Sequence, residues 1–84
     1  MPTIAIIDGV KLVIWPRDHQ PPHIHAYFGE REAWLSIATG QVIHGALPAR
    51  RRKAVQSWLD ANRPRVAYVW DEIRLGRWQG GRLD

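Results

Sequence analysis

The chain has 84 residues, the size of one domain, with 12 basic and 8 acidic side chains and therefore a formal net charge of +4. Apolar residues make up 45% of the sequence, which argues against a disordered chain. No apolar run approaches the ~20 residues of a membrane span, and the absence of cysteine excludes a disulfide scaffold and Cys-ligated zinc. A basic domain of this kind suits nucleic acid, an acidic protein or an anionic surface as partner.

The first half of the chain carries apolar residues at strand spacing, separated by turn signals. Asp8-Gly9 is a strong hairpin signal, and Gly29-Glu30 marks a second turn. The segment 15–22 is expected to be a loop, because its three prolines cannot donate to a strand ladder. The pattern therefore predicts about five antiparallel strands in two or three hairpins, at residues 3–7, 10–15, 23–28, 31–38 and 41–45.

A two-residue turn at Gly29-Glu30 fixes the register of the second hairpin. One face of this hairpin then holds small and aliphatic side chains and must face the core. The opposite face pairs His23 with Ser36, His25 with Trp34 and Tyr27 with Glu32. The register therefore places two imidazoles side by side on the face away from the core.

The second half of the chain has helical periodicity. Pro48 suits the first turn of a helix that runs to about Asn62, and Pro64 is expected to open a second helix capped by Gly76. Each helix has an apolar stripe that is too short to be stable alone, so both should pack on one face of the sheet. The sequence thus predicts a single α+β domain over residues 1–76 and a flexible tail over residues 77–84.

The densest chemistry lies around residue 20, where three of the four histidines and an aspartate fall within eight residues. His23 and His25 share a strand face with Cβ atoms roughly 7 Å apart. Together with Asp18 and His19 they could bind a transition metal such as zinc with an open coordination position.

Two other interpretations fit the same spacing. His23 and His25 could act without metal as an acid–base pair on RNA, with Glu32 orienting His25. Arg17 or Arg31 would then stabilise charge on the phosphorus. Alternatively, the histidines could simply hydrogen-bond and hold the loop to the sheet.

A run of four cations follows Pro48, at the start of the predicted helix. Cations there oppose the helix dipole, each at a cost of ~0.3–1 kcal/mol. No Ser, Thr, Asp or Asn stands at the expected N-cap position. The run is either a site for phosphate or an acidic partner, or a solvated face. Its members are Arg50, Arg51, Arg52 and Lys53.

The sequence resembles the bacterial family called domain of unknown function 4160. The resemblance covers residues 1 to about 70 and rests mainly on the string Asp-His-Gln-Pro-Pro-His-Ile-His at positions 18–25, together with Met1-Pro2-Thr3-Ile4, Gly29-Glu30 and Trp70. It implies a gene neighbour of the domain of unknown function 2442 type, in pairs that look like type II toxin–antitoxin modules. It assigns no role to the signature residues.

Taken together, these observations lead us to expect a small cytoplasmic protein without a signal peptide. The favoured expectation is a toxin that acts on RNA or another phosphate-bearing target through the histidine pair. The alternatives are an antitoxin-like regulator that binds DNA, RNA or protein without catalysis, and a His/Asp metal-binding protein. Whether the protein is an enzyme stays open at this point.

Overall fold

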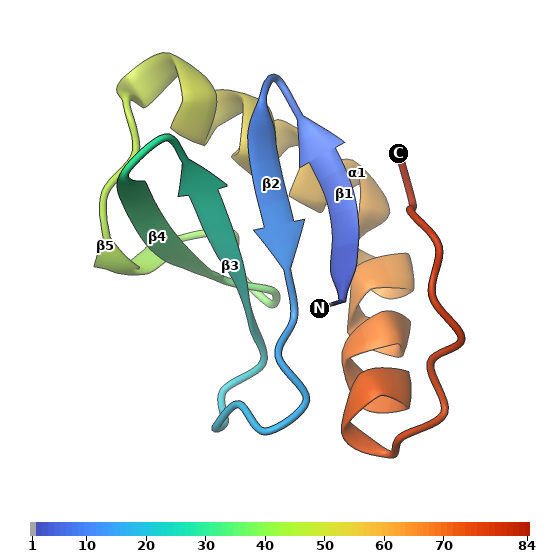
Figure 1. The fold of residues 1–84 in the computed structure, drawn as a ribbon. Coiled ribbons are helices and arrows are strands. Elements are labelled where there is room, and N and C mark those ends of the chain that lie inside the picture. The colour runs from blue at the N-terminus through green and yellow to red at the C-terminus, as the bar shows by residue number, and fades with distance from the viewer. Residues whose placement is uncertain (1) are drawn as a thin grey trace.

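In the computed structural model, which describes residues 2–84, a five-stranded antiparallel sheet precedes one long helix (Figure 1). The strands follow one another in the sheet in chain order, each antiparallel to its neighbour. The predicted α+β class and five-stranded sheet are confirmed. The elements are β1 (Thr3–Ile7), β2 (Val10–Val13), β3 (His23–Phe28), β4 (Arg31–Ser36), β5 (Val42–Gly45) and α1 (Ala49–Arg74).

The two predicted hairpins form around the turns that the sequence marks. Asp8 and Gly9 both have positive φ, at 51° and 78°, as the tight turn between β1 and β2 requires. In the second hairpin all six pairs match the predicted register, including His25 opposite Trp34. The alternation of faces deduced from that register therefore holds for β3 and β4.

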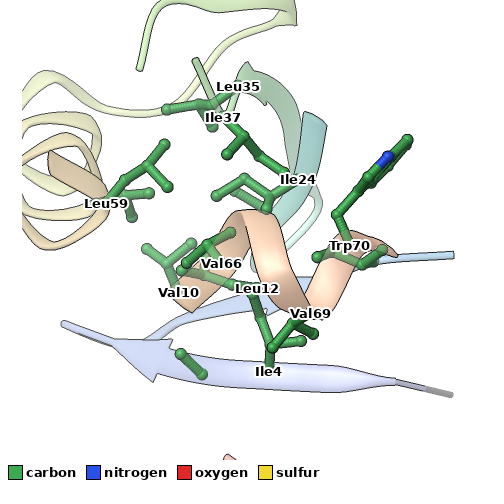
Figure 2. Close-up of a cluster of buried hydrophobic side chains, with 14 of the residues drawn as sticks. Ile4, Val10, Leu12, Ile24, Leu35, Ile37, Leu59, Val66, Val69 and Trp70 are labelled. Carbon is green, nitrogen blue, oxygen red and sulfur yellow. The ribbon is translucent and has the colours of Figure 1, made fainter. Parts of the chain in front are cut away.

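The helix α1 packs across one face of the sheet, and the apolar core lies between them (Figure 2). Val66, Val69 and Trp70 of the helix meet aliphatic side chains from all parts of the sheet. The sheet side of this cluster includes Ile4, Val10, Leu12, Ile24 and Leu35, each fully buried.

The prediction of two C-terminal helices is wrong: residues 49–74 form one helix with a kink. The kink lies at Asn62, whose φ of −122° and ψ of 16° are not helical. Pro64 lacks an N–H and its ring crowds the preceding turn, which strains the helix there. The carbonyl that Pro64 leaves without its helical donor is that of Asp60. Next to this point, the side-chain amide of Asn62 donates to the Trp58 carbonyl at 2.9 Å. Proline bends this helix instead of opening a new one.

The predicted helix end at Gly76 is confirmed. Gly76 has a φ of 72°, its N–H donates to the Ile73 carbonyl, and the Arg77 N–H donates to the Glu72 carbonyl. This pair of bonds is the Schellman arrangement that favours glycine. Among the described residues, no helix combines the length and apolarity needed to cross a bilayer.

Residues 77–84 form no helix or strand and run back toward β1 (Figure 1). The Leu83 N–H donates to the Ile4 carbonyl at 2.7 Å, and the side chains of Trp78 and Leu83 pack against the core. The tail is predicted from the sequence to be flexible, and this stays a prediction. In the structure the tail makes the contacts described above.

Candidate metal centre

Both strand histidines lie on the sheet face away from α1, and both are almost fully buried. His23 is 5% exposed and His25 is 6% exposed. The loop between β2 and β3 contributes to this burial, because the Trp15 ring lies edge-on to His25 with centroids 6.5 Å apart. The same loop carries Asp18 to the imidazoles. Its Gln20–Pro21 peptide is cis.

One atom of Asp18 joins the two imidazoles. Its Oδ2 lies 2.9 Å from Nε2 of His25 and 3.5 Å from Nε2 of His23. The three candidate ligand atoms all lie within 4.8 Å of one another. His19, which the sequence groups with them, is exposed and lies outside this cluster.

The other nitrogen of each imidazole is held by an acceptor. Nδ1 of His23 lies 2.8 Å from the Pro21 carbonyl oxygen, and Nδ1 of His25 lies 3.1 Å from Oε2 of Glu32. A carbonyl can only accept, so Nδ1 of His23 carries the hydrogen and the neutral ring keeps a lone pair on Nε2. Both rings thus direct Nε2 toward Asp18.

Glu32 is fixed in place as the partner of His25. Its Oε2 accepts a hydrogen bond from Nε1 of Trp34 at 2.8 Å, and the same oxygen contacts Nδ1 of His25. The Trp34 hydrogen bond first, and then that of His25, lower the pKa of Glu32 below its usual value. Glu32 therefore stays a carboxylate and holds the His25 ring, in the place that the predicted register gives it.

Nε2 of His23 lacks a hydrogen-bond partner although it is buried. Among the described residues, only Nε1 of Trp78 shares this condition. Leaving a buried polar atom unpaired costs about 1–3 kcal/mol. The unpaired atom points to Asp18 and His25, so a ligand between these three residues would satisfy it.

Aromatic rings close the sides of the cluster. The Trp34 ring stacks on His23 at 5.4 Å and contacts His25 at 4.8 Å, and Trp70 reaches His23 from α1 at 5.5 Å. On the far side of Trp34, the exposed His44 of β5 lies 4.3 Å away. These rings fix the imidazole orientations.

The predicted cation sites are dispersed. Arg17 is exposed in the turn next to Asp18, whereas Arg31 lies at the β3–β4 turn and by alternation shares the helix-facing side of β4. In the run at the start of α1, Arg51 is bound within the chain: its Nη1 donates to the Asp8 carbonyl at 2.7 Å and lies 3.0 Å from the Asp8 carboxylate. Arg50 approaches the same carboxylate at 3.9 Å.

Some of these partners were not predicted from the sequence. The Pro21 carbonyl and Trp70 both contact His23, and neither carries a sequence signal for that role. His44 of β5 lies opposite Trp34, and the irregularity between Trp34 and Leu35 hides this pairing from a count along the sequence.

A family model described as Domain of unknown function (DUF4160) matches residues 9–71 of the 84. The chain belongs to this family. The matched segment of this DUF4160 protein contains Asp18, both buried histidines and Glu32, and it leaves out Trp78 and the rest of the tail. No curated protein and no solved structure matches the chain.

Proposed function

We propose that this protein binds a divalent transition metal, of which zinc is the prime candidate, through Asp18, His23 and His25. The observation that carries the proposal is the convergence of both Nε2 atoms on Asp18 while both Nδ1 atoms are held from behind. Metal-binding histidines almost always donate their second N–H to a carboxylate or a backbone carbonyl. Here Glu32 and the Pro21 carbonyl supply one of each.

Two of the three separations between the donor atoms fit such a centre, and the third is at most 4.8 Å. Ligands 2.0–2.2 Å from a tetrahedral zinc lie about 3.4 Å from one another. The separations of 2.9 Å and 3.5 Å from Asp18 Oδ2 to the two nitrogens bracket that value. Three protein ligands leave at least one position open, where a bound metal supplies Lewis acidity.

The metal-free acid–base mechanism receives less support. Both nitrogens of His25 face carboxylate oxygens, at 2.9 Å and 3.1 Å, so neither is free to exchange a proton with a substrate. Its ring is also buried. A metal at Nε2 takes the place of the proton shared with Asp18 and leaves the Glu32 contact intact.

We further propose that the metal centre belongs to a cytoplasmic toxin of a two-protein module with a partner of the domain of unknown function 2442 type. This role follows from the paired-gene arrangement that the resemblance to the family implies, and the net charge of +4 favours RNA or DNA as the target. Growth inhibition on expression, relieved by the neighbouring gene, would support it. An antitoxin-like regulator would not inhibit growth and would bind nucleic acid or protein equally well after loss of the metal.

Zinc binding is tested by isothermal titration and elemental analysis of protein purified without a His-tag. We expect one zinc per chain in the wild type and in His44→Ala, which removes an exposed histidine outside the cluster. The His23→Ala/His25→Ala variant should bind none. Asp18→Asn alters only the loop residue, so it keeps the test valid if the double variant fails to fold, and we expect weakened binding. Equal zinc binding by Asp18→Asn and wild type, or none by wild type, would refute the proposal.

A further inference from the structure

We propose that the open side of the metal centre receives a phosphate group and that Arg17 holds it there. This inference rests on the metal centre proposed above and names the class of ligand that completes it. Three features of the loop between β2 and β3 support it: which ligand reaches solvent, where the turn places Arg17, and what charge the site carries.

Solvent reaches the centre on the side of Asp18. Its side chain is 18% exposed, whereas the side chains of His23 and His25 are 6% and 7% exposed. The rings of Trp34 and Trp70 cover His23, and the Trp15 ring covers His25. An outside ligand must therefore approach past the loop that carries Asp18.

Arg17 precedes Asp18 in the chain and is the cation next to this opening along the loop. The Asp18 N–H donates to the Trp15 carbonyl at 3.3 Å and closes a turn with Pro16 and Arg17 at its centre. The Arg17 Cα is thus one residue, about 3.8 Å, from that of Asp18. Its side chain is exposed, and within residues 2–84 no carboxylate pairs with it. The arginines at positions 51, 63, 77 and 82 each pair with a carboxylate.

The charge of the opening and the number of contacts it offers favour a phosphate. A divalent metal with one carboxylate ligand stays positive, and Arg17 adds a second positive charge beside it. The negative charge of Glu32 does not offset this positive charge at the opening, because its carboxylate contacts Nδ1 of His25. A phosphate monoester has three terminal oxygens, enough for one metal bond and two parallel hydrogen bonds from the guanidinium. A carboxylate has only two oxygens, so it can make all three contacts only if one oxygen serves two of them.

The other cations do not share this position. Arg31 is equally exposed, but it lies at the far turn of the second hairpin and on the other face of the sheet. Arg31→Ala is therefore a matched control for Arg17→Ala: both remove one exposed arginine from a turn. Neither residue is a proposed metal ligand.

The test uses the full chain loaded with zinc and titrated with inorganic phosphate. We expect both variants to bind zinc as the wild type does, Arg17→Ala to bind phosphate at least 10-fold more weakly, and Arg31→Ala to stay within 2-fold of wild type. Phosphate affinity that is the same with and without zinc, or unchanged in Arg17→Ala, would overturn the inference. Absence of zinc binding would instead overturn the proposed metal centre, so the two failures are distinguishable.

A second series identifies the source of the phosphate group. A 5′-mononucleotide and a single-stranded RNA oligomer with a 5′-terminal phosphate compete with inorganic phosphate on the zinc-loaded protein. Stronger competition by the oligomer, lost in Arg17→Ala, supports a nucleic-acid ligand. Equal competition by both, again lost in Arg17→Ala, supports a small phosphoester. Competition that Arg17→Ala does not affect contradicts the inference.

Discussion

Two polar clusters of this protein differ in how their side chains are satisfied. At the start of α1, Arg51 pairs with the Asp8 carbonyl and carboxylate, and its guanidinium lies 4.7 Å from the centre of the Phe28 ring. On the opposite face of the sheet, Nε2 of His23 is buried and has no hydrogen-bond partner among residues 2–84. The run of cations looks like a ligand site in the sequence, yet its second member, Arg51, holds the β1–β2 turn to the helix.

The difference lies in what each cluster still requires. Arg51 ties the β1–β2 turn to the helix, so part of the basic run is explained without any external anion. Within residues 2–84, every ring nitrogen of the two buried imidazoles has a hydrogen-bond partner except Nε2 of His23, which faces Asp18. A local excess of charge is therefore a weaker sign of a ligand site than one buried atom without a partner.

The largest effect is expected from removing the unpartnered atom. His23→Ala should abolish measurable zinc binding, because the remaining two ligands hold zinc weakly. Zinc added at 100 times its dissociation constant should stabilise the wild type by about 2.7 kcal/mol against unfolding and leave the variant unchanged. Thermal unfolding with and without zinc measures the stabilisation of the wild type and of the variant. A similar shift of the melting temperature in the variant would show that His23 is not a ligand.

A change at Gly45, whose backbone lies against that of Glu32, should have an effect of similar size. Gly45 has a φ of 73°, and an added Cβ would collide with the Glu32 carbonyl. Gly45→Ala should therefore lower stability by about 2–4 kcal/mol. Gly29→Ala is the control, because Gly29 also has positive φ but has open space around its Cβ position. The two variants should differ in urea unfolding, and equal losses would mean that the close approach to Glu32 is unimportant.

Loss of the Glu32 carboxylate should affect the metal more than the fold. Glu32→Ala leaves Nδ1 of His25 without its acceptor, and such partners typically contribute 10–100-fold in metal affinity. Glu30→Ala, in the turn between β3 and β4 and outside the cluster, should leave the zinc dissociation constant unchanged. Competition with a chelator of known affinity measures the difference. Equal zinc dissociation constants for the two variants would show that Glu32 does not support the metal centre.

The smallest effect belongs to the basic run. Arg51→Ala should reduce stability by about 1–2 kcal/mol, because it removes the Asp8 contacts and the interaction with Phe28. Arg52→Ala should change stability by less than about 0.5 kcal/mol. Neither should alter zinc binding. Urea unfolding of the two variants checks this, and a larger loss for Arg52→Ala would contradict the role assigned to Arg51.

Local patterns predicted much of this fold and part of the site. The Asp8-Gly9 turn, the pairs of the second hairpin and the contact between Glu32 and His25 all follow from alternation and a two-residue turn. Pro64 was misread, because a proline opens one helix or bends another depending on tertiary contacts. The Arg51–Asp8 pair joins residues 43 positions apart, a proximity that no local pattern indicates. The reach of Trp70 to His23 depends likewise on where the helix crosses the sheet.

The central claim is that Nε2 of His23 and Nε2 of His25 face one metal ion while each Nδ1 keeps its partner. Nitrogen-15 NMR of the histidine rings, recorded with and without zinc, tests it directly. We predict that the Nε2 signals of His23 and His25 shift together at one equivalent of zinc, that their Nδ1 atoms stay protonated, and that His44 does not change. Unchanged Nε2 signals, or zinc-dependent shifts confined to the exposed His19 and His44, would contradict the account.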